Sequence, residues 1–199
     1  MSISNIRIVE KPDWVTWESV RQCLIDAHVM NRAKGIHMAH YLWSAEKIKE
    51  SLGEKGKMFV ALDGESAVGT AAISFKFGNF WYVHGEYAYM GFAGVLPAYK
   101  GHGIYKELIR LREEYARQKQ CDILLFDTHS QNKHVQEIAK SNGYRLVRFF
   151  RAKSGDHYSV VLVKWINGCP FSSFYCWMRY QISKLKVLIC YRLRNEKQS

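Results

Sequence analysis

The stretch that most restricts the fold of this chain is "GVLPAYKGHGIYKELI", residues 94–109, where an apolar run leads through a proline and two glycines into an amphipathic helix. A strand, a tight turn through Gly101 and Gly103, and a helix from Ile104 form an arrangement that binds anions, because free N–H groups of the first helical turn point into the turn. Glycine lets the backbone approach a phosphate without an intervening β-carbon, and Lys100 adds a positive charge at the same place. The stretch therefore predicts a phosphate-binding turn, although glycine turns also occur for purely structural reasons. It lacks the third glycine of a dinucleotide-binding motif and is not a Walker A loop.

The hydrophobic pattern of the remaining chain predicts a mixed α/β sheet in a single domain. Apolar runs, alternating or continuous, predict strands over residues 5–10, 58–62, 66–77, 82–96, 122–126, 145–152 and 157–166. Apolar residues at helical spacing predict helices over residues 14–30, 44–53, 104–119 and 132–141, the first of them capped by Asp13. Residues 31–43 fit neither period, so we expect a loop or a broken helix there.

The last segment, residues 167–199, differs in composition and is expected to extend a domain that spans residues 1–166. Its apolar residues approximate a helical stripe and comprise Trp177, Ile182, Leu185, Leu188 and Ile189. Its basic residues, set against the single acid Glu196, are Arg179, Lys184, Lys186, Arg192, Arg194 and Lys197. A basic amphipathic helix of this kind lies on an anionic membrane surface or binds a partner. The alternative is a helix that packs on the sheet and leaves its lysines in solvent.

The composition is that of a folded chain in a reducing compartment. A length of 199 residues with 48% hydrophobic and 14% aromatic residues is ample for a buried core. The five cysteines show no CxxC spacing, which indicates neither a disulfide framework nor a zinc site. Residues 1–13 are mixed and polar, unlike a signal peptide, and no apolar run approaches the roughly 20 residues that cross a bilayer. We therefore expect a cytoplasmic protein.

The net charge of +11 and the pI of about 9.4 call for an anionic partner or only reflect a basic surface. Nucleic acid, anionic lipid, and a polyanionic cofactor or substrate would each be suitable. The basic residues are spread out and match no nucleic-acid-binding motif, so nucleic acid is not expected.

The order of elements and two motifs together resemble the GNAT N-acetyltransferases, which use acetyl-CoA. The signature of that family is Val-x-Pro at the end of the fourth strand, then Arg/Gln-x-x-Gly-x-Gly/Ala at the start of a helix. This chain has Val95-Leu96-Pro97 and then Lys100-Gly101-His102-Gly103-Ile104-Tyr105. A second family landmark, an Asn followed by a helix and a Gly–aromatic pair, corresponds to Asn132 and Gly143–Tyr144. The resemblance covers about residues 5–166, and its motifs fall within 82–144.

The resemblance implies a mostly antiparallel central sheet of six to seven strands flanked by helices, here with a basic amphipathic C-terminal helix added. It implies that the backbone of Ala93, Gly94 and Val95 pairs with the pantetheine arm, and that Asn132 contacts the same arm. The amides that would hold the pyrophosphate are those of Lys100, Gly101, His102, Gly103, Ile104 and Tyr105. Lys100 keeps a cation in place of the usual Arg or Gln. Tyr105 occupies a slot that is usually small, and we expect its ring to swing back over the preceding turn.

Glu86 is the best candidate for the base that removes a proton from the amine. It lies on the strand where many family members carry a catalytic glutamate, and it is the only carboxylate between Glu65 and Glu107. Burial in this aromatic strand would raise its pKa toward neutrality. His84, two residues earlier on the same face, is expected to relay the proton or share the role. The alternatives are a salt-bridged Glu86 and an ordered water as the base.

The acid that protonates the leaving thiolate is less clear, because Ala139 stands where the family often has a tyrosine. The candidate substitutes are His134, Ser130, His129 and Tyr105, and solvent is a further alternative.

Three histidines lie close together in the N-terminal part of the sequence: His28, His37 and His40. No carboxylate or cysteine at credible spacing completes a set of metal ligands with them, so no metal site is expected. In the family the first two helices and their loop shape acceptor specificity, which here corresponds to residues 30–43.

The sequence therefore predicts an acetyl-CoA-dependent N-acetyltransferase that moves the acetyl group to an amine by direct attack in a ternary complex. A small-molecule amine is expected, and an amino sugar or nucleotide sugar is favoured because aromatic side chains stack on sugar rings; the candidates are Trp81, Tyr82, Tyr87 and Tyr89. A protein amine is the other acceptor. Alternative functions are a non-catalytic CoA-binding module and an acyltransferase that uses a longer acyl donor at a membrane surface. A homodimer is left open.

Overall fold

The computed structural model describes residues 6–36, 42–152 and 157–195. Within these residues it contains seven strands and six α-helices, and the predicted class, a mixed fold with a mostly antiparallel sheet, is confirmed. The chain divides into two compact units, residues 1–124 and 125–199.

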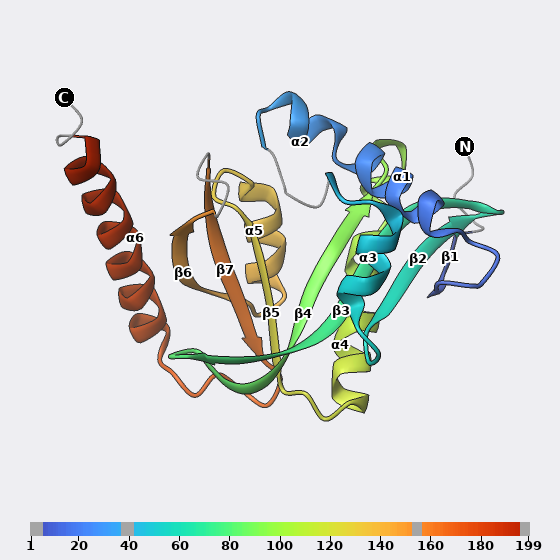
Figure 1. Ribbon diagram of the computed structural model, residues 1–199. Coiled ribbons are helices and arrows are strands. Elements are labelled where there is room, and N and C mark those ends of the chain that lie inside the picture. The colour runs from blue at the N-terminus through green and yellow to red at the C-terminus, as the bar shows by residue number, and fades with distance from the viewer. Residues whose placement is uncertain (1–5, 37–41, 153–156, 196–199) are drawn as a thin grey trace. The chain divides into compact units, whose positions relative to one another are not determined.

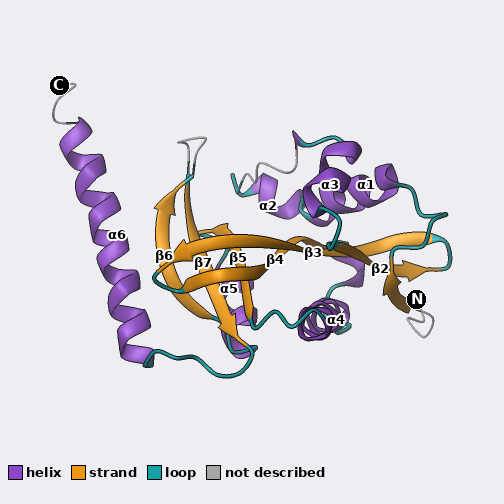
Figure 2. Cartoon of the chain, turned by 60° about the horizontal axis from the view of Figure 1, so that its bottom comes forward, coloured by secondary structure: helices purple, strands orange, loops and turns teal. Residues whose placement is uncertain are grey.

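The first unit is an antiparallel meander of four strands with helices on both faces (Figure 1). Its elements are β1 (Ile6–Glu10), α1 (Trp17–Ala27), α2 (Val29–Ala33), α3 (Ala45–Leu52), β2 (Lys57–Asp63), β3 (Ser66–Phe80), β4 (Val83–Val95), the 3-10 helix η2 (Pro97–Tyr99) and α4 (Ile104–Gln118). The helices α1 and α3 cover one face of the strands, and α4 covers the other (Figure 2). The strand β4 leads through η2 and a glycine turn into α4, as the sequence predicts.

The second unit begins within β5 (Ile123–His129) and continues with α5 (Lys133–Ser141), β6 (Arg145–Arg151), β7 (Tyr158–Trp165) and α6 (Ser173–Asn195). The strand β7 lies between β5 and β6 and pairs antiparallel with β6. The helix α6 packs beside β6.

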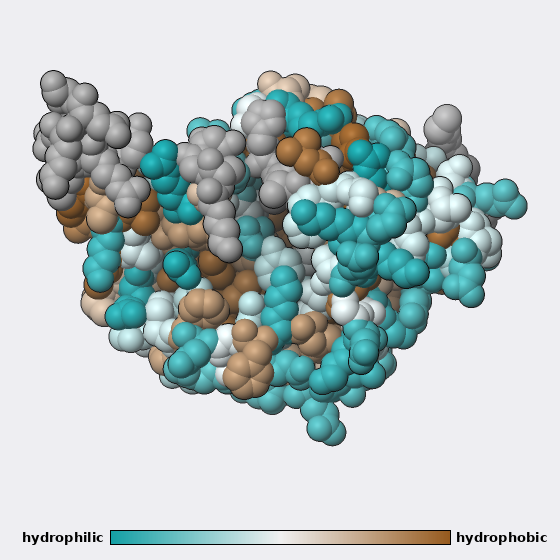
Figure 3. Space-filling model, in the orientation of Figure 1, coloured by the Kyte–Doolittle hydropathy of each residue, from teal (hydrophilic) through white to brown (hydrophobic). Residues whose placement is uncertain are grey.

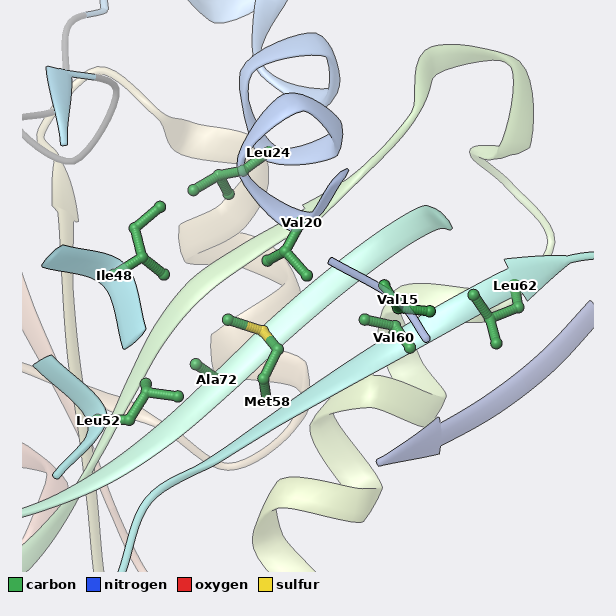
Figure 4. Close-up of a cluster of buried hydrophobic side chains, with 9 residues drawn as sticks. All are labelled: Val15, Val20, Leu24, Ile48, Leu52, Met58, Val60, Leu62 and Ala72. Atoms are coloured by element: carbon green, nitrogen blue, oxygen red, sulfur yellow. The ribbon is translucent and has the colours of Figure 1, made fainter. Parts of the chain in front are cut away.

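The core between α1, α3 and the strands of the first unit is aliphatic (Figure 4). Its buried members are Val15, Val20, Leu24, Ile48, Leu52, Met58, Val60, Leu62 and Ala72. Trp43 and Phe92 pack against this cluster from its border, with ring centroids 5.7 Å apart. The core therefore fixes α1 above β4, where the candidate site lies.

One local prediction is wrong. Thr16, not Asp13, caps α1, because its hydroxyl accepts the Ser19 N–H at 3.0 Å and is therefore correctly placed for an N-cap. Of the two expectations for residues 31–43, the broken helix agrees with the short helix α2, which follows α1 after a break at His28; residues 37–41 lie outside the described part of the chain. The helix predicted from residue 44 is confirmed, and the Ser44 hydroxyl caps it by accepting the Lys47 N–H at 3.2 Å.

Candidate functional site

A β-bulge interrupts β4 two residues before its end. Thr70 of β3 pairs with Gly94, and Ala72 pairs with Gly91, so Phe92 and Ala93 together lie opposite one residue of β3. Phe92 has a φ of 47°, a left-handed conformation that is uncommon outside glycine. A bulge of this kind turns carbonyl groups out of the ladder and away from their usual partners.

Side chains satisfy both bulge carbonyls. The Thr70 hydroxyl, fully buried, donates to the Phe92 carbonyl oxygen at 3.0 Å. His28, at the end of α1, donates from Nε2 to the Ala93 carbonyl oxygen at 2.9 Å. The bulge is thus held in place from β3 on one side and from α1 on the other.

His28 is a neutral, buried imidazole. A carbonyl can only accept, so Nε2 carries the proton, and Nδ1 accepts from the Asn31 amide at 3.1 Å. Burial lowers the pKa of His28 below its ordinary value of 6.5, and the positive charges of Lys100 and Arg32 lower it further, against the opposing effect of the Ala93 hydrogen bond. Since both ring nitrogens are engaged, His28 is placed to position β4 rather than to accept a proton.

The sequence indicates His28 only as one of three histidines that are not expected to form a metal site. The other two members, His37 and His40, lie outside the described residues. The hydrogen bond between His28 and Ala93 joins residues 65 positions apart in the chain, so no local sequence pattern predicts it.

Gly94, next to the bulge, allows α1 to approach β4 closely. A β-carbon at this position would lie 2.7 Å from the Ala27 β-carbon and 3.1 Å from His28 Nε2. A larger residue would therefore push α1 and His28 away from the strand.

The glycine turn has the conformation that an anion-binding turn requires. Gly101 and Gly103 have φ values of 84° and 77°, and no atom lies within 4 Å of where a β-carbon would be at either position. Gly103 caps α4, whose first main-chain hydrogen bond runs from Glu107 N–H to Gly103 O at 3.0 Å. The three preceding N–H groups, of residues 104–106, therefore face the turn without an intrahelical acceptor. The open space, the free donors and the exposed Lys100 fit a pyrophosphate group.

Tyr105 forms a hydrogen bond through its hydroxyl with Arg112, a buried residue further along α4. Burial of this hydroxyl raises the pKa of Tyr105, while Arg112 acts in the opposite direction. A buried guanidinium requires acceptors, and Tyr105 is one of them. The expected orientation of the Tyr105 ring over the glycine turn stays a prediction.

The two candidates for proton transfer lie at the far end of β4 from the bulge. The predicted burial of Glu86 is wrong, because its side chain is 41% exposed and forms an ion pair with Lys55 at 3.1 Å. His84 is also exposed and donates from Nδ1 to the Asn79 side-chain oxygen at 2.7 Å. Ala93 lies seven positions after Glu86 in the strand, which corresponds to about 23 Å along an extended chain. Their catalytic roles stay predictions.

The remaining candidates belong to the second unit. The Asn132 side chain is buried and donates to the Thr128 hydroxyl at 3.2 Å, at the start of α5. His129 is buried and accepts the Gln131 N–H at 3.1 Å, whereas His134 is exposed. The contact of Asn132 with the CoA arm and the identity of the acid stay predictions. In the part of the chain that the structure describes, no three His, Cys, Asp or Glu side chains form a group that could hold a metal ion.

Residues 17–144, well over half of the chain, match the Acetyltransferase (GNAT) family, and the chain belongs to this family. Membership confirms the predicted family, the enzyme class and acetyl-CoA as the co-substrate that the family uses.

Three known proteins are informative. N-alpha-acetyltransferase 30 of Saccharomyces cerevisiae is 28% identical over 89 residues, which make up 43% of this chain and 51% of that protein. The chain thus spans about half the length of this curated relative. The structure of Arabidopsis thaliana NAA60 with a bisubstrate analogue has a TM-score of 0.62 at 18% identity, over 82% of this chain and 99% of that one. The PaiA N-acetyltransferase of Thermoplasma acidophilum with coenzyme A has a TM-score of 0.61 at 16% identity, over 81% of this chain and 99% of that one. At these identities the two structures show a common fold.

Proposed function

We propose that this chain is an acetyl-CoA-dependent N-acetyltransferase that acts on the α-amino group of a polypeptide. The observation that carries the proposal is the juxtaposition, within one unit, of a side-chain-supported bulge in β4 and a glycine turn at the start of α4. The bulge would present backbone groups to the pantetheine arm, which is extended and contains amides. The glycine turn would present N–H groups to the phosphates.

This geometry supports the binding roles that we propose. The backbone of Ala93, Gly94 and Val95 holds the pantetheine arm, and the amides from Lys100 to Tyr105 hold the pyrophosphate. Lys100 contributes a fixed positive charge at the same turn. When bound, acetyl-CoA supplies an activated thioester, so the protein has mainly to position the acceptor amine and to manage protons.

Proton removal is assigned to Glu86, assisted by His84. Both side chains are exposed, so a proton that the amine loses near the bulge would reach them through water. In the neutral ring of His84, with Nδ1 donating to Asn79, Nε2 carries the lone pair and can accept this proton.

The acceptor assignment rests on the yeast relative, which is an N-alpha-acetyltransferase. The case for an amino sugar depended on aromatic side chains of the β3–β4 hairpin. Two of these already have partners within the protein, since Tyr82 stacks on Phe80 at 5.4 Å and Lys76 lies over the Tyr89 ring at 4.3 Å. A polypeptide amine is therefore the acceptor that we favour over a sugar.

A matched set of acceptors tests this function. One peptide with an internal lysine is offered with a free N-terminus and with a blocked one, beside glucosamine, and released CoA thiol is measured with acetyl-CoA as donor. We expect thiol release only with the free N-terminus, and mass spectrometry should place the acetyl group on the α-nitrogen. Acetylation of lysine or of glucosamine instead would refute the acceptor. Binding of acetyl-CoA without thiol release would favour the non-catalytic alternative.

A further inference from the structure

The helix α6 has two faces of different character, both within the second unit. Toward β6, the Ser183 hydroxyl accepts the Phe149 N–H at 2.8 Å, and the Tyr180 ring packs edge-on against Phe149. Cys176, on the same side, is buried. This face is occupied by the protein itself.

The opposite face exposes an apolar stripe. Its members are between 40% and 69% exposed and comprise Phe174, Trp177, Ile182, Leu185, Leu188 and Ile189. With a turn of about 100° per residue, these positions fall on the side of the helix away from Cys176, Tyr180 and Ser183. Part of the stripe is visible in Figure 3 as brown atoms along α6. Large side chains in a continuous exposed stripe mark a surface that binds something.

Positive charges border this stripe on both sides. By the same helical geometry, Lys184 lies along one border, and Arg179 and Lys186 lie along the other. The sequence from Ser173 to Asn195 contains five basic residues and no acidic ones, and the chain as a whole carries +11.

We propose that the apolar stripe of α6 lies on an anionic lipid surface. Apolar side chains would enter the boundary between head groups and acyl chains, while the bordering lysines and arginine extend to the lipid phosphates. Phe174 and Trp177, at the start of the helix, add aromatic rings that favour this interface. No helix in the described part of the chain is long and apolar enough to cross a bilayer.

Charge favours lipid over a second copy of the chain. A symmetric dimer through this stripe would bring the same cationic borders together without an acid in the helix to neutralise them. An anionic bilayer complements both borders at once, because the negative surface potential attracts the cations on each side of the stripe.

Vesicle flotation with the full-length chain tests the proposal. The vesicles are pure phosphatidylcholine or phosphatidylcholine with about one third phosphatidylserine, and the bound fraction is measured at low and high salt. We expect binding to the anionic vesicles only, and loss of binding at high salt. The double variant Leu185→Glu/Leu188→Glu should reduce binding about tenfold or more with an unchanged circular dichroism spectrum. The control Phe77→Glu, at an exposed apolar residue of β3, should bind like the wild type.

Three outcomes would overturn the proposal. They are failure to bind anionic vesicles, equal binding by the double variant, and equal binding by both kinds of vesicle. Analytical ultracentrifugation of the wild type and the double variant tests whether the stripe binds a second copy of the chain instead of lipid. A concentration-dependent dimer that the double variant loses would assign the stripe to an interface between chains.

Discussion

At the scale of single residues, His28 has the most consequences for the site. It is buried, holds the Ala93 carbonyl of the bulge, and lies close to two cations, Lys100 and Arg32. A third positive charge at this place would be poorly solvated and would be repelled by the two cations, which favours the neutral ring. The role therefore depends on the ring staying uncharged.

We expect the stability of the wild type to fall as pH drops below about 6.5, more steeply than that of His28→Gln. The pKa of His28 is lowered in the folded state, so above its ordinary value both states are neutral and His28 adds no pH dependence. Below that value the unfolded chain takes up the proton first, and stability is lost until pH reaches the folded pKa. Glutamine keeps a donor for Ala93 but does not titrate. Melting temperatures measured between about pH 8 and pH 5 check this, and parallel curves for the two proteins would contradict it.

For Glu86, we expect Glu86→Gln to lower turnover by about tenfold or more, with little change in acetyl-CoA affinity. The amide cannot accept a proton but keeps the size of the side chain. Lys55→Met is the matched control, because it removes the ion pair and keeps the carboxylate. An exposed pair of this kind contributes about 0–1 kcal/mol, so neither variant should unfold the protein. Turnover within about twofold of the wild type for Glu86→Gln would remove Glu86 as the base.

At the scale of elements, the sequence predicted the turn before α4 but not the bulge before it. Gly101, Gly103 and the apolar spacing of α4 are local signals, and each element end lies within a few residues of its prediction. The bulge depends on Thr70 and His28, which are far from Phe92 in the sequence. An extra residue in a mostly apolar strand also leaves no visible break in the hydrophobic pattern of the sequence. The prediction that Glu86 is buried is wrong for a related reason. Its partner Lys55 lies 31 positions away in the sequence, in the loop before β2.

The bulge gives a prediction of its own. Thr70→Val keeps the shape of the side chain but removes the Thr70 hydroxyl as a donor to the Phe92 carbonyl, which should cost about 0.5–1.5 kcal/mol of stability. We also expect a higher KM for acetyl-CoA, because the adjacent backbone of β4 is proposed to hold the pantetheine arm. Thr70→Ser keeps the hydroxyl and should restore the KM. If valine raises KM and serine fails to restore it, the hydroxyl is not the cause.

The glycine turn is tested by a pair of equivalent substitutions. Gly103→Val places a β-branched residue at a φ of 77° and directs its side chain into the space proposed for the pyrophosphate. Gly53→Val imposes similar strain at a φ of 67° at the end of α3, next to the loop whose Lys55 pairs with Glu86 at the other end of β4. Each should cost about 1–3 kcal/mol of stability, and calorimetry should show a loss of acetyl-CoA affinity of about tenfold or more for Gly103→Val alone. Equal affinities for the two variants would refute the assignment of the turn.

At the scale of the whole molecule, the sequence suggested a boundary at residue 166, with the segment beyond it as an appendage. In the structure, α6 packs on β6 of the second unit, and the chain divides into two compact units at residue 124. The exposed stripe accounts for the composition of the helix, whereas its packing depends on a few residues of the other face. The boundary at residue 166 stays a prediction, which truncation of the chain tests.

The chain truncated after residue 166 should accordingly be less stable than the full-length chain. Removal of α6 takes away the Ser183 acceptor of the Phe149 N–H and the Tyr180 ring, and it uncovers β6 at the edge of its strand order. An uncovered edge strand pairs readily with other chains, so we expect a lower melting temperature and concentration-dependent aggregation. Leu185→Glu/Leu188→Glu, which changes only the exposed face, should melt like the wild type. An unchanged melting temperature for the truncated chain would show that α6 contributes nothing to the stability of the fold, and would support the boundary at residue 166 that the sequence suggested.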